Sequence, residues 1–171
     1  MGNKYFLSIV FLLCGMVFLF SCKKNDVSAP YTNYGQYVFA GTASASQIVP
    51  VNANDSSLGY AIFNGTYDST LQIFNYTISW VGLTGKVSGL NFYAGADSGQ
   101  VAPLARNIAT YTSANYLPNS STFTAVYWNY NRLSGAEFNA LKNNKWYYII
   151  NTQNFPAGEV RGQIRLVGTF K

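Results

Sequence analysis

Histidine is absent from the chain, cysteine occurs only twice, and charged residues make up only 10% of it. Both cysteines, Cys14 and Cys22, lie in an apolar N-terminal segment. The rest of the chain therefore has no disulfide, no thiol nucleophile and no imidazole. This excludes Ser-His-Asp and Cys-His catalysis, and zinc or copper sites built from His and Cys. We expect no cofactor and no bound metal.

A dense cluster of basic residues is also lacking. The formal net charge is +5, but the basic side chains are scattered, apart from Lys23-Lys24 and the pair Arg161 and Arg165. Proteins that bind nucleic acid concentrate their positive charge in a patch or stripe. We therefore expect no nucleic-acid partner.

Residues 1–22 have a basic start at Lys4 followed by an apolar run, which is typical of a secretory signal peptide. Leu19-Phe20-Ser21-Cys22 resembles the bacterial lipobox, in which the chain is cleaved before a cysteine that is then lipidated. The alternatives are ordinary signal cleavage or an uncleaved anchor. The lipobox predicts a lipoprotein of the bacterial cell envelope, held to the outer membrane through Cys22 and facing either the periplasm or the surface.

Residues 23–35 are polar and without periodicity, which predicts a flexible tether. Residues 36–171 are long enough for one domain with its own core. Aromatic residues make up 17% of the chain, and short alternating runs are separated by turn residues. This pattern predicts an all-β domain of about eight strands.

The most regular alternation runs from Leu71 to Val81, and we predict that Phe74, Tyr76, Ile78 and Trp80 face the core. Further strands are expected at residues 37–41, 58–64, 86–94, 100–108 and 122–128. The strand at 58–64 should be closed by turn residues at Asn64-Gly65 and Tyr67-Asp68-Ser69. The strand at 100–108 contains Pro103, which favours a sheet edge.

The C-terminal part predicts one short helix and a hairpin. Ser134 and Glu137 fit a capping box for a helix at residues 134–143. The apolar run at 146–150 is typical of a strand covered on both faces. In the next strand, the alternation predicts Val160, Gly162, Ile164 and Leu166 on the packed face, and Glu159, Arg161, Gln163 and Arg165 on the solvent face.

Four segments, in order, resemble the CHRD domain, a module first named from chordin. They are Ser46-Gln47-Ile48-Val49-Pro50-Val51, Gly82-Leu83-Thr84-Gly85, the helix entry at 133–138, and the stretch at 155–164 that contains Gly158-Glu159-Val160-Arg161-Gly162-Gln163. The resemblance implies a Greek-key fold, an immunoglobulin-like or superoxide-dismutase-like sandwich or barrel, in extracytoplasmic proteins with no established enzymatic activity.

The chain departs from that family at three positions. Many members have a His-x-His pair after the Gly-Leu-x-Gly turn and another histidine before a threonine near the end. The matching residues here are Asn91, Tyr93 and Asn151. Asn and Tyr can form hydrogen bonds with each other or with a loop, but they do not replace imidazole as ligands of a transition metal. We expect a polar patch at most.

The first functional hypothesis is a non-enzymatic, lipid-anchored envelope protein whose β-domain binds a protein or glycan or has a structural role. A long loop at residues 109–121 and the strand after it supply aromatic side chains suited to such contacts. The candidates are Tyr111, Tyr116, Tyr127, Trp128 and Tyr130. The alternative for each is packing within the domain, which is favoured for Trp128.

The second hypothesis is a carboxylate-dependent extracytoplasmic hydrolase, using two residues among Asp55, Asp68, Asp97, Glu137 and Glu159. We favour structural roles instead: a helix cap for Glu137, a partner for Arg161 or Arg165 in the case of Glu159, and turns for the aspartates. Calcium at Asp97 would need more carboxylates nearby than the sequence shows.

Overall fold

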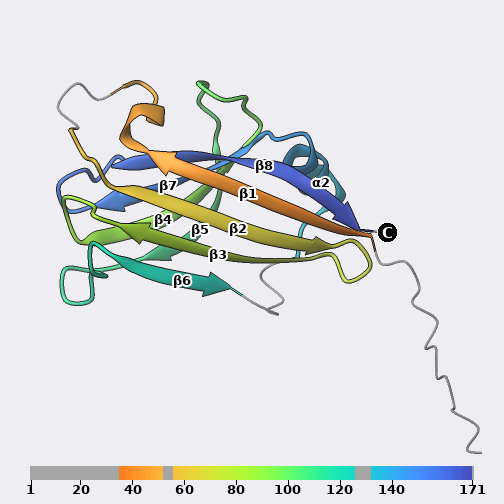
Figure 1. The fold of residues 1–171 in the computed structure, drawn as a ribbon, viewed down its shortest axis with the longest axis horizontal. Coiled ribbons are helices and arrows are strands. Elements are labelled where there is room, and N and C mark those ends of the chain that lie inside the picture. Colours follow the sequence, from red (N-terminus) through yellow and green to blue (C-terminus); the bar gives the residue numbers. More distant parts are fainter. Residues whose placement is uncertain (1–34, 52–55, 126–131, 171) are drawn as a thin grey trace, which may run out of the picture. The chain divides into compact units, whose positions relative to one another are not determined.

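The structure is a computed structural model, and it describes residues 35–51, 56–125 and 132–170. The described strands form an eight-stranded antiparallel sheet, accompanied by a short 3-10 helix and an α-helix (Figure 1). In chain order the elements are β1 (Gln36–Ser44), η1 (Ala45–Gln47), β2 (Tyr60–Asp68), β3 (Ile73–Val81), β4 (Val87–Ala94), β5 (Leu104–Thr110), β6 (Ser121–Ala125), α2 (Gly135–Lys142), β7 (Trp146–Thr152) and β8 (Val160–Phe170).

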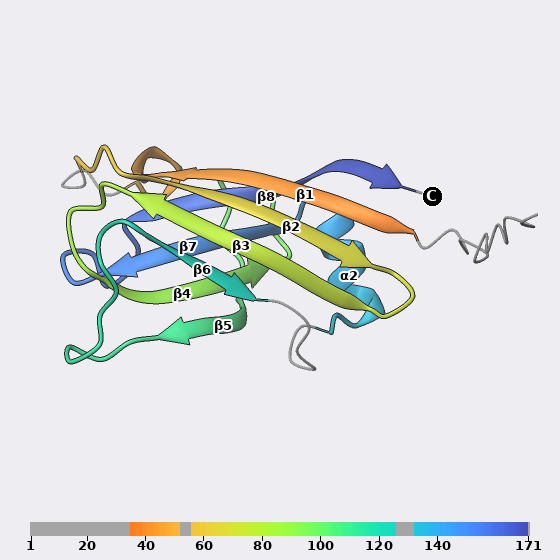
Figure 2. The ribbon, with the colours of Figure 1, turned by 60° about the horizontal axis from the view of Figure 1, so that its bottom comes forward.

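The strand order across the sheet is β5-β4-β7-β8-β1-β2-β3-β6. The sheet curls, so that β4, β5 and β7 form one layer beneath a second layer of β1, β2 and β3 (Figure 2). The chain passes from one layer to the other between β3 and β4, between β5 and β6, and between β6 and β7. The prediction of an all-β sandwich or barrel with one short helix is confirmed. The edge position of β5 is confirmed too.

The core lies between the two layers. Phe74, Tyr76, Ile78 and Trp80 are buried, as the alternation along β3 predicts. Aromatic rings from the two layers meet there, with the ring of Phe92 in β4 centred 5.0 Å from that of Tyr76 in β3. Large aromatic side chains contribute most of the buried apolar area in such a core.

Several of the predicted strand boundaries are wrong. β1 continues past Gly41 to Ser44. β2 does not turn at Asn64-Gly65 but continues to Asp68. Gly65 serves packing instead, because a Cβ at this position would lie 2.8 Å from Cζ of Phe63. β5 does not span Pro103; it begins at Leu104 and continues to Thr110, because proline cannot donate a ladder hydrogen bond.

β7 and β8, the last strands in the chain, lie in the middle of the sheet between β4 and β1. β7 is buried almost along its whole length, as predicted. The prediction for β8 is wrong for Glu159, Arg161 and Gln163, which are buried, whereas Arg165 is exposed. Other parts of the chain cover the outer face of the sheet at this point, so both faces of the first half of β8 are shielded from solvent.

Helix α2 begins after Ser134, and the predicted capping box is present. The Ser134 hydroxyl accepts from the backbone N–H of Glu137, and the Glu137 carboxylate accepts from the backbone N–H of Ser134. The same carboxylate forms an ion pair of 2.7 Å with Arg106 of β5. Burial raises the pKa of Glu137, but the hydrogen bonds from Ser134 and Arg106 outweigh it, and the net pKa is lowered.

The predicted signal peptide, Cys22 and the tether fall outside the described residues. In the described ranges, no helix combines the length and the apolar character that a membrane crossing requires.

Candidate functional site

A groove of about 520 Å³ lies where three connections meet, those from β3 to β4, from β5 to β6 and from β7 to β8. This volume falls in the usual range of small-ligand sites. The lining side chains are mainly polar: Thr84, Gly85, Lys86, Tyr116, Pro118, Asn119, Gln153 and Asn154.

Hydrogen bonds between the connections hold the groove together. Asn119 forms a two-way link with Leu83: its carbonyl accepts from the Leu83 N–H, and its side-chain amide donates to the Leu83 carbonyl, each at 3.1 Å. The Asn154 side-chain amide donates to the Thr84 carbonyl at 3.0 Å. The Gln153 N–H donates to the Lys86 carbonyl at 3.0 Å. Residues far apart in sequence are therefore fixed relative to one another.

Beneath these connections lies Glu159, whose side chain is fully buried. Its Oε1 accepts from the Ser57 hydroxyl and from the Thr84 N–H, and its Oε2 accepts from the Thr152 hydroxyl, each at 2.7 Å. The predicted pairing of Glu159 with Arg161 or Arg165 is therefore wrong. Its carboxylate instead joins the β1–β2 and β3–β4 connections to β7.

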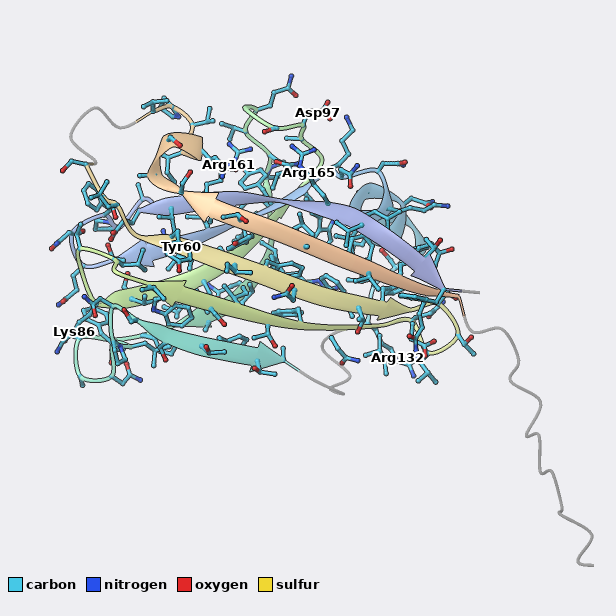
Figure 3. The ribbon with its side chains drawn as sticks, viewed as in Figure 1. Tyr60, Lys86, Asp97, Arg132, Arg161 and Arg165 are labelled. Carbon is cyan, nitrogen blue, oxygen red and sulfur yellow. The ribbon has the colours of Figure 1, made fainter. Side chains whose placement is uncertain are left out.

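Three side chains of the groove remain available to a ligand. Within the described part of the chain, the side chains of Lys86, Tyr116 and Gln153 form no hydrogen bond. Lys86 and Gln153 are exposed and Tyr116 is half-buried. Lys86 lies at the end of the sheet where the three connections meet (Figure 3). Together they offer an ammonium group, an amide, and a phenol with an aromatic face.

The predicted tyrosines therefore have different environments. Tyr116 lines the groove, whereas Tyr111 packs against the main core, and burial raises the pKa of its phenol. Tyr127 and Tyr130, with Trp128, lie outside the described residues. Sequence reasoning missed Lys86, Asn119, Gln153 and Asn154. Two of these lie at turns that are clear in the sequence: Lys86 follows the Gly82–Gly85 turn, and Asn154 begins the turn that ends at Gly158.

Asn91, Tyr93 and Asn151, the positions at which the family resemblance leads us to expect histidine, lie on the outer face of the sheet. The side-chain amide of Asn91 in β4 donates to Asn151 Oδ1 in β7 at 2.8 Å, and the Asn151 amide donates to the Pro156 carbonyl at 2.8 Å. Tyr93 does not join them. Its ring stacks on Tyr147, with centroids 4.9 Å apart and planes within 4°. The polar patch is thus a hydrogen-bonded pair of asparagines beside an aromatic stack.

The described carboxylates are all engaged in contacts within the domain. Asp68 accepts from the N–H groups of Thr70 and Leu71, and Asp97 pairs with Lys145. Glu137 and Glu159 have the partners given above, and Asp55 lies outside the described residues. Among the residues that the structure describes, no three Asp, Glu, His or Cys side chains gather as a metal site would require.

These features define an antiparallel β-domain of the sandwich or barrel class, with a polar groove at its loop end and a polar cluster on its outer face. The family model of the CHRD domain matches residues 39–164. The match spans most of the chain, and the chain therefore belongs to the CHRD domain family. Comparisons with curated proteins and with solved structures give no match.

Proposed function

We propose that this chain is a non-enzymatic, lipid-anchored protein of the bacterial cell envelope, and that its CHRD domain binds a glycan in the groove around Tyr116. The proposal rests on one observation. Hydrogen bonds between the connections fix the frame of the groove, whereas the side chains of Lys86, Tyr116 and Gln153 are left to bind a ligand. A rigid frame lowers the entropy that is lost on binding.

The groups in the groove suit a sugar better than an apolar ligand. Hydroxyl groups can accept from Lys86 and can both donate to and accept from Gln153. A pyranose ring has an apolar face of C–H groups, and the ring of Tyr116 offers a flat surface for it. A protein partner that presents polar side chains at the same groove is the second candidate.

The lipid anchor rests on the sequence. A lipobox that ends in Cys22, followed by Lys23-Lys24 and a polar tether, supports an outer-membrane lipoprotein with the domain facing the periplasm or the surface. Replacing Cys22 with Ser should abolish labelling by a fatty-acid probe and release the protein from the membrane fraction. A serine variant that is labelled and sediments like the wild type would contradict the anchor.

The binding proposal is tested with a panel of envelope glycans and the purified full chain in mild detergent. Tyr116→Ala should weaken saturable binding by about tenfold or more, because it removes the aromatic surface. Tyr60→Ala is the matched control, since Tyr60 is an exposed tyrosine of β2 that does not line the groove (Figure 3). Equal losses in the two variants would contradict the assignment of the groove.

The same samples test the non-enzymatic part of the proposal. Bound glycans should be recovered intact after long incubation. Hydrolysis that disappears on replacing one Asp or Glu would instead support a carboxylate-dependent hydrolase.

A further inference from the structure

Arg161 is a buried cation on the outer face of β8, with only 2% of its surface exposed. The guanidinium carbon lies 3.7 Å from the centre of the Tyr147 ring, and Nη2 donates to the Gln100 carbonyl at 2.6 Å. Tyr147 stacks in turn on Tyr93. One face and one edge of the guanidinium are therefore held in place, and its orientation is fixed.

No carboxylate neutralises this charge within the described residues. The described ion pairs join Asp97 to Lys145 and Glu137 to Arg106, and Glu159 is engaged by Ser57, Thr84 and Thr152. Burial lowers the pKa of Arg161, and the nearby Tyr147 opposes the shift. A buried charge normally has a counterion or a ligand.

A second cavity, of about 390 Å³, opens beside Arg161. Its walls come from the segment that contains η1 and from the loop after β4. Ser46 and Ser98 contribute hydroxyl groups, whereas Ile48, Val49 and Val51 contribute apolar surface. Arg161 lies near the loop that carries Asp97 (Figure 3). The cavity thus places one fixed cation beside a wall that is partly apolar and partly polar.

We propose that this cavity binds a small monocarboxylate, with its carboxylate on the Arg161 guanidinium and its apolar body against Ile48, Val49 and Val51. The planar guanidinium matches a carboxylate through two parallel hydrogen bonds. A single positive charge balances a monoanion, whereas a phosphate dianion would retain an unpaired charge. Ser98 adds a hydroxyl donor to the carboxylate. This site does not depend on the glycan groove.

The test uses N-acetyl-leucine as the probe, with the neutral N-acetyl-leucinamide as the matched ligand. The full chain in mild detergent is titrated, and the ¹⁵N–¹H signal of the Arg161 side chain is followed by NMR. The acid should shift this signal in a saturable way. The amide should bind at least about tenfold more weakly, since it cannot form a charge-assisted pair with the guanidinium.

Two variants at the rim test the same site without altering Arg161. Val51 is 70% exposed, so a polar residue at this position leaves the core intact. Val51→Asp should weaken binding of the acid by about tenfold or more, because the new carboxylate competes for Arg161. Val51→Asn has the shape of Val51→Asp without the charge and loses the same apolar contact, so it should bind the acid at least about threefold more tightly than Val51→Asp does.

Several results would overturn the proposal: equal binding of acid and amide, no shift of the Arg161 signal at about 10 mM acid, or unchanged binding in Val51→Asp. Inorganic phosphate that displaces the acid at equal or lower concentration would overturn the assignment of a monocarboxylate. Binding of the acid that survives Tyr116→Ala separates this site from the glycan groove.

Discussion

Replacing Glu159 with Ala should destabilise the domain more than any other single change of a described carboxylate. The substitution removes the acceptor for three donors: the Ser57 hydroxyl, the Thr84 N–H and the Thr152 hydroxyl. Because Glu159 is fully buried, water does not reach the vacated position freely. The donors must rotate to other acceptors or remain unpaired.

The magnitude follows from what each donor can do. A buried donor without a partner costs about 1–3 kcal/mol. The Thr84 N–H belongs to the backbone and cannot reorient, whereas the two hydroxyl groups can. Adding the loss of charge-assisted bonds, we expect Glu159→Ala to lower the free energy of unfolding by about 3–5 kcal/mol.

Glu159→Gln should be milder, at about 1–2 kcal/mol. Its remaining oxygen still accepts from Ser57 and Thr84, but as a neutral group. The new amide faces Thr152, whose hydroxyl oxygen already accepts from the Phe155 N–H at 3.2 Å. That oxygen has a second lone pair for the amide, but the Thr152 hydroxyl loses its own acceptor, so one donor rather than three must find a new partner.

The assay is urea unfolding followed by tryptophan fluorescence, with amide exchange of Thr84 as a local measurement. The free energy of unfolding should decrease from the wild type to Glu159→Gln and further to Glu159→Ala. The Thr84 amide should lose most protection from exchange in Glu159→Ala. Asp97→Asn is the control, because it breaks only the surface pair with Lys145 and should cost under about 1 kcal/mol. The reasoning is refuted if the free energy of unfolding of Glu159→Ala lies within about 1 kcal/mol of the wild-type value, or if Glu159→Gln and Glu159→Ala are equally stable.

Three further predictions concern packing and pH. Gly162→Ala should lower the free energy of unfolding in urea by about 3 kcal/mol, because the new Cβ would lie 2.9 Å from two backbone atoms of β1. Gly135→Ala is the control: Gly135 lies in open space at the start of α2, so this change should be neutral or stabilising. Equal effects of the two substitutions would contradict the prediction. Burial raises the pKa of Tyr76 to about 12, so stability should fall by about 2 kcal/mol as the pH rises from about 10 to 12, and less in Tyr76→Phe; identical slopes would refute it. The pKa of Glu137 is lowered by Ser134 and Arg106, so its contribution should be lost as the pH falls below about 4.5, and Glu137→Gln should flatten the acid limb of the unfolding curve; an unchanged acid limb would argue against that ion pair.

The sequence predicts the elements whose pattern is local. The period of two along β3 identifies its buried face, and the Ser134–Glu137 spacing identifies the start of α2. Both signals come from residues that are close together in the sequence, so they can be recognised without knowledge of tertiary contacts.

The predictions fail where a segment distant in sequence determines whether a side chain is buried. Arg161 and Gln163 alternate with apolar residues like a solvent-facing row, but the loop after β4 covers them: Gln163 donates to the Ala96 carbonyl at 3.1 Å, and Arg161 donates to that of Gln100. The groove is assembled in the same way from three connections. Of its side chains, only Tyr116 is identified in advance, by residue type in a long loop.

The central position of the last two strands has a consequence for folding during synthesis. Until β7 and β8 emerge, the earlier strands form two separate groups, β1-β2-β3-β6 and β4-β5, each with a strand edge that lacks its neighbour. Such edges pair readily with other chains. A nascent chain that stops before Trp146 therefore lacks the part that joins the two groups, and we expect C-terminal truncations to yield aggregates rather than a smaller stable domain.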